Sequence, residues 1–388
     1  MKKDNHTLNY TPRIVFIGND TGRTGAPIIL LEIARHLNSL GWRCTFVFER
    51  DGVLTEQFKQ VGNCYFWYKN LDSITLKPLR WVAKFSYMLG IQSLERFFLK
   101  QKIKRIKPDL IYANTGVTGY LLKEFKHPRI PALMHIHEMQ SILRNFCGHK
   151  FTQGILHTDR FIVVNKLIKD NLITEYKIPL QKIEVIPAFM PYSDTRHSPE
   201  KKENAQFIVG SAGMPSFRKG TDLFIKVAAL TKKICGKKIL FRWVGFNPED
   251  SSNYEYQCLI KELEIDDIIE LIPHTATPLL EFAKFDIFLL SSREDPNPLV
   301  VLESGQLGKP VLSFKGSGAT DEIVEAGGGT MVAMESIEEM ATAIVEYMRD
   351  PALRKQKSQR IEKVIRENYS KKIILKKITY SIKKLIQQ

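Results

Sequence analysis

Short apolar runs rich in β-branched residues recur along the chain and alternate with amphipathic stretches of helical period. In the first half the apolar runs occupy residues 13–18, 43–48, 109–114, 131–137, 160–165 and 182–187. One intervening stretch, IILLEIARHLNSL, is followed by Gly41 where a helix would end. Buried parallel strands are near-continuous apolar runs, so the alternation predicts a parallel sheet with helices on both faces.

The same alternation restarts after a polar segment. Residues 188–206 contain two prolines and no periodicity, which is typical of an interdomain linker. Beyond it, strands are predicted at 207–212, 238–245, 285–292 and 309–314, and helices are predicted over TDLFIKVAALTKKI and from about Leu299. A chain of 388 residues is long enough for two domains. We therefore predict an α/β protein with two Rossmann-like, doubly wound domains at 1–190 and 205–365.

Two further stretches combine apolar and basic residues. Residues 76–107 are rich in aromatic and basic side chains. In the tail, 366–388, Ile374, Ile378 and Ile382 share one face and lysines occupy the other. A basic amphipathic helix can lie on an anionic membrane, or its apolar face can pack back on the first domain. The pattern leaves both alternatives open.

Charge is distributed unevenly over the chain. Of the net +15, residues 1–192 contribute most, with 28 Lys/Arg against 15 Asp/Glu. A basic face can attract phosphates, anionic lipid or nucleic acid. The alternative is a lysine-rich surface that only contacts solvent. The chain has no membrane-spanning apolar run and no signal-peptide pattern, and its five cysteines are scattered. These features predict a cytoplasmic protein with reduced thiols, with a peripheral position on the inner face of the membrane as an alternative.

The most informative motif is SSREDPNPLVVLESGQLGKPVLSF, residues 291–314. A predicted strand ends, the acids Glu294 and Asp295 follow, and a proline-bracketed loop leads into a helix that carries Glu303. Free N–H groups at a helix N-terminus bind phosphate, and carboxylates accept hydrogen bonds from sugar hydroxyls. Together these groups indicate a nucleotide-sugar site. A second motif, GSAGMPSFRKGTDLF, places Arg218 and Lys219 at a strand-to-helix turn, where two cations suit a diphosphate leaving group.

Two motifs in the first half also follow predicted strands. GNDTGRTGAP, residues 18–27, is a glycine-bearing turn but not G-x-G-x-x-G, which argues against a dinucleotide site. MHIHEM, residues 134–139, places His135 and His137 on one strand face. A metal site would need a third ligand, which the spacing does not supply, so no metal is expected. A purely structural histidine remains an alternative.

These motifs resemble those of glycosyltransferase family 4, retaining enzymes of the GT-B fold, and the resemblance spans most of residues 13–333. The family's E-x7-E motif matches D-P-N-P-L-V-V-L-E, with Asp295 where the first Glu is commoner. The resemblance implies that Asp295 or Glu294 lies near the donor sugar and that Glu303 binds the ribose. It adds to the donor-binding set the residues of the intervening loop and helix start, which are Asn297, Pro298, Leu299 and Val300.

In the family's basic motif, Lys219 and Gly220 match, whereas Met214 occupies the usual arginine position, so Arg218 is the expected substitute. In the first domain, Gly25 and Ala26 match a loop that faces the donor phosphate and the acceptor. His137, followed by Glu138, matches a histidine near the donor sugar. The resemblance thus implies His137, Asp295 and Lys219 as the catalytic set, on two domains that face each other across a cleft.

The predicted function is transfer of a hexose from a UDP- or GDP-linked sugar to a glycan or lipid-linked acceptor in bacterial surface polysaccharide biosynthesis. No D-x-D triplet is present, so metal-independent transfer without a cofactor is expected. Retention of anomeric configuration is implied by the resemblance alone. Three alternatives stay open: a non-catalytic nucleotide-sugar or glycan-binding protein, another GT-B activity such as hydrolysis or epimerisation, and a nucleic-acid-binding protein. The acidic motif counts against the last, and no nucleic-acid partner is expected.

Overall fold

The computed structural model describes residues 10–68, 91–190 and 206–388. These residues form two compact units, one made of Met1–Ile186 with Leu375–Gln388 and the other of Pro187–Ile374. Most of the predicted linker 188–206 and the first part of the aromatic and basic stretch 76–107 lie outside the described residues.

The first unit contains a seven-stranded, all-parallel sheet in the order β3-β2-β1-β4-β5-β6-β7. Its strands are β1 (Arg13–Gly18), β2 (Arg43–Phe48), β3 (Gly62–Phe66), β4 (Leu110–Ala113), β5 (Ala132–Ile136), β6 (Arg160–Val163) and β7 (Ile183–Val185). The parallel sheet predicted from the apolar runs is confirmed, and β3 is the one strand in it that the pattern did not indicate.

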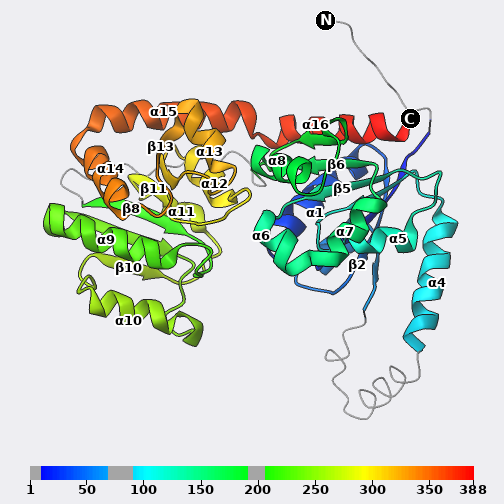
Figure 1. The fold of residues 1–388 in the computed structure, drawn as a ribbon, viewed down its shortest axis with the longest axis horizontal. Helices are drawn as coiled ribbons and strands as arrows, with labels where there is room; N and C mark the ends of the chain where they lie inside the picture. The colour runs from blue at the N-terminus through cyan, green and yellow to red at the C-terminus, as the bar shows by residue number, and fades with distance from the viewer. Residues whose placement is uncertain (1–9, 69–90, 191–205) are drawn as a thin grey trace, which may run out of the picture. The chain divides into compact units, whose positions relative to one another are not determined.

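The connections in the first unit are mostly helical (Figure 1). The helices are α1 (Gly25–Ser39), α2 (Thr55–Val61), α4 (Ile91–Ile106), α5 (Leu122–Phe125), α6 (Gln140–Ile142), α7 (Gly148–Leu156) and α8 (Lys166–Thr174). Short turns of other helical types are η2 (Gly119–Leu121), η3 (Leu143–Cys147) and η4 (Leu180–Lys182). Because all seven strands are parallel, every strand's carboxyl end lies on one edge of the sheet.

The two faces of this sheet are packed differently. One face carries aliphatic residues such as Val15, Ile17 and Ile111, which join helix residues in a buried cluster. The other face carries a row of rings, in which Phe16 lies 5.4 Å from Phe46 and 5.2 Å from Tyr112, measured between centroids. Because side chains alternate along each strand, both faces are buried. This explains the near-continuous apolar runs.

The second unit has a six-stranded parallel sheet in the order β10-β9-β8-β11-β12-β13. Its strands are β8 (Phe207–Ala212), β9 (Ile239–Val244), β10 (Ile269–Ile272), β11 (Ile287–Leu290), β12 (Val311–Phe314) and β13 (Gly329–Val332). Its helices are α9 (Thr221–Cys235), α10 (Tyr254–Glu262), α11 (Pro278–Phe282), α12 (Leu299–Gln306), α13 (Thr320–Ile323), α14 (Ile337–Arg349) and α15 (Pro351–Asn368). Shorter turns are η5 (Gly236–Lys238), η6 (Ser251–Asn253) and η7 (Val324–Gly328). A second parallel sheet was predicted and is confirmed.

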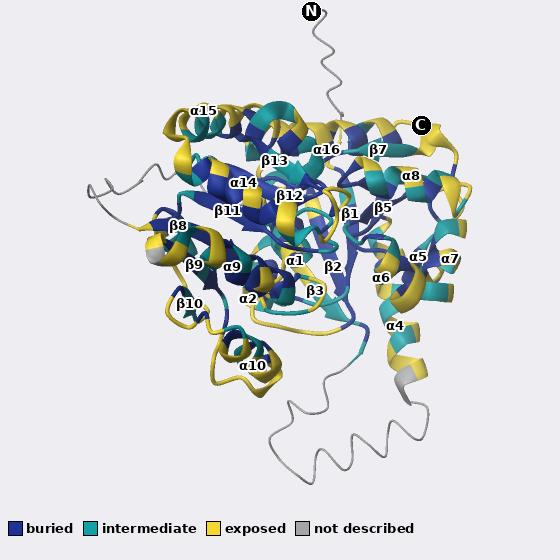
Figure 2. Cartoon of the chain, turned by 60° about the vertical axis from the view of Figure 1, so that its left-hand side comes forward, coloured by how far each residue is buried: buried dark blue, intermediate teal, exposed yellow. Residues whose placement is uncertain are grey.

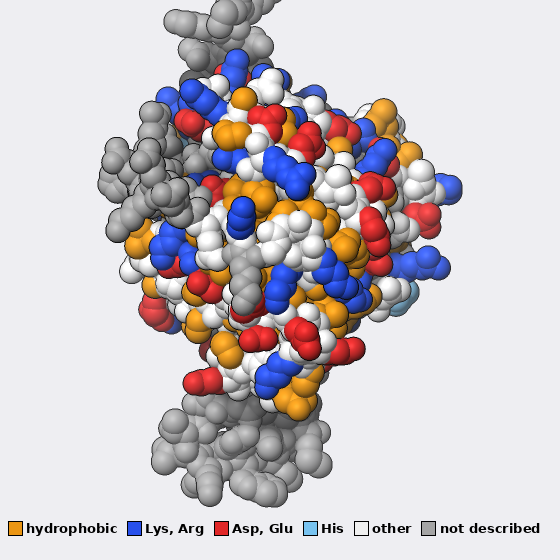
Figure 3. Space-filling model, turned by 90° about the vertical axis from the view of Figure 1, so that its left-hand side faces the viewer, with side chains coloured by type: hydrophobic (Ala, Val, Ile, Leu, Met, Phe, Trp, Pro, Cys, Tyr) orange, Lys and Arg blue, Asp and Glu red, His pale blue; other side chains and the backbone are white. Residues whose placement is uncertain are grey.

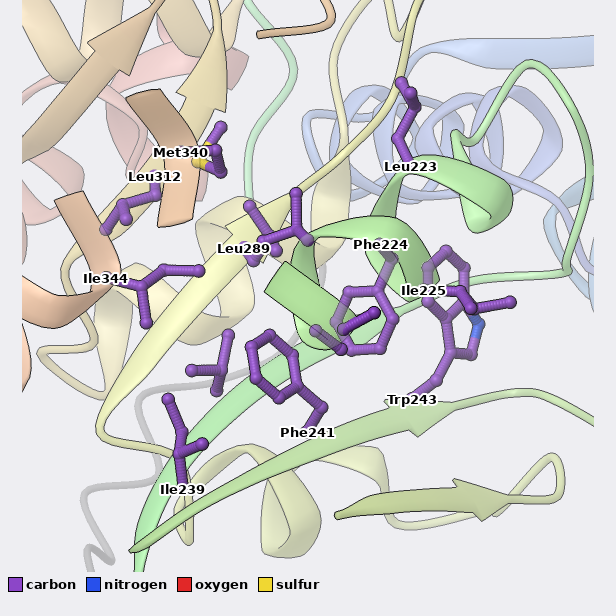
Figure 4. Packing of buried hydrophobic residues seen from close by; sticks show 14 of the residues in the cluster. Leu223, Phe224, Ile225, Ile239, Phe241, Trp243, Leu289, Leu312, Met340 and Ile344 are labelled. Atoms are coloured by element: carbon purple, nitrogen blue, oxygen red, sulfur yellow. The ribbon is translucent and has the colours of Figure 1, made fainter. Parts of the chain in front are cut away.

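Strand alternation divides the core of the second unit into two clusters. Phe241 and Trp243 face α9, where the Phe224 ring lies 5.5 Å and 5.1 Å from theirs (Figure 4). Val244 and Phe288 point to the opposite face, toward a cluster that includes residues of α12 and α15. Full burial of each large side chain contributes about 1.5–3 kcal/mol. Helices on both faces leave the carboxyl edge of the sheet as the place for a ligand.

The tail helix α16 (Lys371–Ile386) has a buried and an exposed face. Ile374, Ile378 and Ile382 are at most 1% exposed, so the apolar face of this helix is core. From Leu375 onward its residues belong to the first unit. The lysines of this helix are exposed or half-buried. No helix in the described part of the chain combines the length and hydropathy that a membrane span requires.

Candidate active site

A buried ion pair joins the two sequence motifs of the second unit. The Lys219 ammonium, on the turn after β8, pairs with Oδ2 of Asp295, in the loop after β11. Both side chains are largely buried, at 16% and 7% exposure. Ser292 Oγ donates to the same carboxylate oxygen over 3.4 Å. The two residues that the resemblance singles out are therefore in direct contact at the carboxyl edge of the sheet.

The turn that carries Lys219 approaches β11 closely because the next residue is glycine. Gly220 has φ +63°, and a Cβ there would lie 1.9 Å from the backbone oxygen of Ser291. Ser291 Oγ also donates to the Lys219 carbonyl at 3.1 Å. On the other side of the acidic loop, a Cβ on Gly318 would lie 1.8 Å from the Asp295 carbonyl oxygen. Two glycines thus allow backbone segments to enclose Asp295.

We expect Gly220→Ala to destabilise the protein much more than Gly41→Ala, its control after the C-terminus of α1. Both glycines have positive φ, of +63° and +83°. Positive φ costs an L-residue about 1–2 kcal/mol. A Cβ on Gly41 meets no other atom within 4 Å, whereas one on Gly220 meets backbone. Urea unfolding should show a loss of at least about 3 kcal/mol for Gly220→Ala and about 1 kcal/mol for Gly41→Ala. Equal losses would contradict this account of the turn.

A second charged cluster holds the same turn in place. Arg293 donates through Nη1 and Nη2 to the two carboxylate oxygens of Asp222, at 2.7 and 2.9 Å. Its guanidinium lies 3.7 Å from the Phe217 ring centroid and donates to the Phe217 carbonyl. Burial opposes ionisation of Asp222, but the hydrogen bonds and charge of Arg293 outweigh it and lower the pKa of Asp222. We find no sequence signal for this cluster, because Arg293 pairs with a residue 71 positions away.

The structure distinguishes the two adjacent acids. Asp295 is 5% exposed and pairs with Lys219, whereas Glu294 is half-buried. Arg218 is exposed, and its Nη1 donates to the backbone carbonyl of Glu294 at 2.7 Å. Met214, at the position where the family usually has arginine, is 81% exposed. Arg218 therefore lies beside the acidic loop, and Asp295 is the acid that the Lys219 turn contacts.

Glu303 lies on α12, the helix that the acidic loop enters. Its side chain is 7% exposed, and no donor among the described residues reaches its carboxylate. Desolvation raises its pKa to about 7. Burying a carboxylate without a partner is costly, so the position favours a ligand that supplies hydroxyl donors.

The start of α12 offers further polar groups. Pro298 is the N-cap and provides no side-chain cap, so the first N–H groups, at Leu299 and Val300, have no partner within the helix. Both polar side-chain atoms of Asn297 are buried and lack a hydrogen-bond partner within the described residues. The buried hydroxyls of Ser317, in the loop after β12 that pairs with Asp295, and of Thr320, at the start of α13, are likewise unpartnered in the described residues. Sequence reasoning missed these two, since small hydroxyl residues in a loop carry no specific signal.

In the first unit, His137 follows β5 and lies beside the start of α1. Its Nε2 is 3.3 Å from Asn114 Oδ1, and Asn114 Nδ2 donates to the Ala26 carbonyl at 3.0 Å. Gly25 is the first residue of α1 and is exposed. The structure therefore brings together Gly25, Ala26 and His137, with Asn114 as a link that the sequence did not indicate.

His135 and Glu138 flank His137 and are both desolvated. His135 is 1% exposed, its Nδ1 is 2.6 Å from Tyr112 Oη, and its ring centroid lies 4.1 Å from that of His137. Burial raises the pKa of Glu138 to about 7, although the N–H groups of Gly116 and His137 donate to its carboxylate. In the described ranges, no group of three His, Cys, Asp or Glu side chains is placed to hold a metal ion.

We expect His137 to remain neutral at pH 7. Desolvation lowers its pKa to about 4, below the ordinary value near 6.5. In ¹⁵N-histidine NMR spectra, the His137 signals, assigned by their loss in His137→Gln, should not titrate between pH 5.5 and 8. Exposed histidines such as His149 serve as the internal control. A midpoint near 6.5 for His137 would contradict the enclosed environment.

Two parallel Rossmann-like sheets with polar groups collected at their carboxyl edges define a GT-B-type protein. Sequence comparison is consistent with this class: residues 23–191 match the profile of glycosyltransferase family 4, and residues 193–364 match that of glycosyl transferases group 1. The chain belongs to glycosyltransferase family 4, the glycosyl transferases group 1.

Individual relatives are more distant. The chain is 28% identical over 232 residues to alpha-galactosylglucosyldiacylglycerol synthase of Streptococcus pneumoniae, covering 56% of this chain and 59% of that protein. It is 29% identical over 178 residues to an uncharacterized glycosyltransferase of Haemophilus influenzae, covering 43% and 48%. The matched stretches thus span about half to three fifths of these curated relatives.

Solved structures share the fold over almost the whole chain. Anabaena Alr3699/HepE in complex with UDP superposes with a TM-score of 0.76 at 18% identity, over 96% of this chain and 100% of that one. The lipopolysaccharide outer core galactosyltransferase WaaB superposes with a TM-score of 0.73 at 16% identity, over 95% and 99%. The predicted GT-B fold is therefore confirmed.

Proposed function

We propose that this protein transfers a hexose from a nucleoside-diphosphate sugar to a glycan or lipid-linked acceptor, with retention of anomeric configuration. The single observation that supports this most is Glu303, a buried carboxylate with no donor among the described residues, on the helix that follows the Lys219–Asp295 pair. A ribose diol would supply the hydroxyl donors that Glu303 lacks. HepE, which shares the fold, has been crystallised with UDP and with UDP-glucose.

In this proposal the second unit binds the donor. Lys219, with Arg218 beside the acidic loop, neutralises the diphosphate, and the free N–H groups of Leu299 and Val300 add helix-terminal donors. Asp295 accepts hydrogen bonds from the sugar hydroxyls, and Asn297 accepts through Oδ1 and donates through Nδ2. Charge increases on the diphosphate as the glycosidic bond breaks, so these groups stabilise the transition state more than the ground state.

His137, with a lowered pKa, is proposed to act as a neutral hydrogen-bonding group toward the donor sugar and not as a cation. Asn114 fixes its ring through Nε2, and the same amide holds the Gly25–Ala26 helix start. The assignment of these three residues to the donor follows the family resemblance.

The proposed acceptor is lipid-linked, in bacterial surface polysaccharide biosynthesis, with the protein on the cytoplasmic face of the membrane. The S. pneumoniae relative is named for synthesis of a glycosylated diacylglycerol. On α4, at the edge of the first unit in Figures 1 and 2, Leu94, Phe97 and Phe98 are 54%, 52% and 61% exposed. Lys102 and Lys104 are exposed on the next turns. Apolar and basic side chains on one helix suit an anionic membrane surface.

The second unit has a different surface character. Residues 187–374, which make up this unit, hold 25 Lys/Arg against 27 Asp/Glu. On the face seen in Figure 3, basic and acidic side chains are interspersed. We therefore assign membrane contact to α4 in the first unit and not to the tail, whose apolar face is buried.

We expect the double variant Phe97→Ser/Phe98→Ser to bind anionic vesicles at least about 10-fold more weakly, because each phenyl ring inserted into lipid contributes about 1.5–3 kcal/mol. Co-sedimentation with phosphatidylglycerol-containing vesicles measures this. Phe146→Ser is the matched control, since Phe146 is 83% exposed in the first unit but lies outside α4. Equal binding by all three proteins would remove α4 from the membrane contact.

The transferase proposal is tested with the purified protein and a panel of UDP- and GDP-linked hexoses. Release of one nucleoside diphosphate, measured with and without extracts of lipid-linked glycans as acceptor, identifies the donor. ¹H NMR of the released or transferred sugar reports its anomeric configuration, and a retained α-linkage is expected. An inverted product would overturn the assigned stereochemistry. Nucleotide binding without any turnover would replace the enzyme with a non-catalytic binding protein.

A further inference from the structure

Arg293 joins two helix starts at the carboxyl edge of the second sheet. The helices α9 and α14 cover the same face of this sheet and share one buried core cluster (Figure 2). Asp222 lies in the first turn of α9, and Glu335 directly precedes Ser336, the N-cap of α14. The Arg293 guanidinium donates to both acids, through Nη1 and Nη2 to Asp222 and through Nε to Glu335. One side chain, 15% exposed, thus connects the segments that follow β8, β11 and β13.

Glu335 makes this contact from an unfavourable backbone conformation. Its φ is +61°, in the left-handed region that a glutamate rarely adopts. Such conformations persist where the surrounding contacts determine them, and they are common at functional sites. The Glu335 side chain is 47% exposed, so its contact with Arg293, at 2.5 Å, holds it without full burial. The backbone strain indicates that this contact is maintained against a local preference.

The segment after β11 also holds the turn that carries Lys219. Ser291 Oγ donates to the Lys219 carbonyl at 3.1 Å, and the Arg293 N–H donates to the Arg218 carbonyl at 2.9 Å. Arg293 Nη1 donates to the Phe217 carbonyl at 2.8 Å, and the guanidinium lies over the Phe217 ring. The carbonyls of three successive residues, 217 to 219, therefore accept hydrogen bonds from this one segment.

The position of the Lys219 ammonium depends on this turn. A lysine carries its charge at the end of a flexible four-carbon chain, so the ammonium is directed by the backbone that bears it and by its partner Asp295. In the proposed function the ammonium also neutralises the donor diphosphate. Misplacing a catalytic group by about 1 Å can cost about 10²-fold in rate. A turn that is held at three successive carbonyls limits such displacement.

We propose that Arg293 is a positioning residue for Lys219, which holds the turn so that the Lys219 ammonium meets the leaving diphosphate. A guanidinium has five N–H donors in a planar fork, and Arg293 uses this fork for the Asp222 carboxylate, the Phe217 carbonyl and Glu335. An ammonium is a compact charge that does not span these three acceptors, so lysine does not replace Arg293. The inference rests on the proposed function, because it assigns Arg293 to the diphosphate side of that transferase.

The first test observes the Lys219 ammonium in the full chain and needs no turnover. In low-temperature NMR spectra of ¹⁵N-lysine-labelled protein, a buried and paired ammonium exchanges slowly and gives a signal, which is assigned by its loss in Lys219→Met. Arg293→Gln should broaden this signal beyond detection. Lys226→Gln is the matched control, since Lys226 Nζ lies 3.6 Å from Oδ2 of the same Asp222 but does not contact the turn; it should leave the signal unchanged.

A double-mutant cycle separates positioning from a general loss of stability. Arg293→Gln and Arg293→Lys should each lower kcat/KM for sugar transfer about 10- to 100-fold. In the Lys219→Met background the same substitutions should lower it less than about 2-fold, since no ammonium is left to position. Melting temperatures are measured for each variant. If Arg293→Gln does not fold, Asp222→Asn, which keeps Arg293, takes its place in both tests with an effect in the same direction.

Two results would overturn the proposal. One is an unchanged Lys219 signal in a folded Arg293→Gln variant, and the other is a loss of kcat/KM by the same factor with and without Lys219. If the unmodified protein cleaves no donor, the transferase proposal fails by itself. The NMR comparison then still decides whether Arg293 positions the Lys219 ammonium.

Discussion

We expect Lys219→Met to lower kcat/KM for sugar transfer about 10²–10³-fold, the size of effect that follows removal of one preorganised donor to a developing oxyanion. The Lys219 side chain is 16% exposed and forms an ion pair with Asp295. Methionine keeps most of the side-chain volume and removes the charge. Initial rates with the identified donor measure the effect, and Lys284→Met, a surface lysine paired with Glu281, should leave them unchanged.

Loss of the ion pair must be separated from loss of catalysis. Removing Lys219 alone leaves Asp295 buried without its cation, which costs about 3–5 kcal/mol for a buried pair. The double variant Lys219→Met/Asp295→Asn removes both charges and should recover most of that stability. It should not recover activity. If the double variant regained both stability and rate, Lys219 would be only a structural partner of Asp295.

The second large effect is expected at Glu303. Glu303→Gln should weaken binding of the nucleoside diphosphate about 10- to 100-fold, because hydrogen bonds from a ribose diol to a carboxylate contribute about 1.5–3 kcal/mol. Calorimetry with the identified nucleotide measures this. Asp321→Asn, in the same unit and also with a raised pKa, is a matched acid-to-amide control. An unchanged dissociation constant for Glu303→Gln would remove it from the nucleotide site.

The same substitution should change the pH dependence of stability. The pKa of Glu303 is raised to about 7 in the folded protein, so the folded state binds a proton that the unfolded state has released above pH 4.5. Stability is therefore lost as the pH rises from about 4.5 through 7. Between pH 5 and 8 the unmodified protein should lose about 2.5 kcal/mol relative to Glu303→Gln. Urea unfolding at both pH values measures it, and parallel curves would contradict the raised pKa.

The fold was largely predictable because buried parallel strands leave a strong pattern. β1, β2 and β8 begin and end where the apolar runs do. The strands that the pattern missed, β3, β10 and β13, are all outermost in their sheets. A strand with a neighbour on one side only needs less apolar surface. β3 (GNCYF) and β10 (IELI) are mostly half-buried, and β3 and β13 (GTMV) begin with glycine. Edge strands carry less of the periodic signal.

The candidate site was predictable only where the residues are close in sequence. Lys219 and Asp295 were found separately as motifs, and the structure shows their contact across 76 positions. Arg293 was overlooked although it is next to the acidic pair, because its partners Asp222 and Phe217 come from another connection. Asn165 is the N-cap of α8 through its hydrogen bond from the Ile168 N–H, a local role that no motif indicated. A local sequence motif identifies candidate residues. Contacts between residues of different strand-to-helix connections depend on the order of the strands in the sheet, which a local motif does not give.

The central claim is that the second unit binds a nucleoside diphosphate, and a thermal-shift measurement with UDP, GDP and ADP tests it most directly. At a hundredfold excess over its dissociation constant, a ligand adds about 2.7 kcal/mol to the free energy of unfolding. We predict that one of these nucleotides raises the melting temperature of the unmodified protein and of Lys284→Met. The same nucleotide should have little effect on Lys219→Met and Glu303→Gln. No shift with any of the three, in a sample with a cooperative transition, would contradict the account.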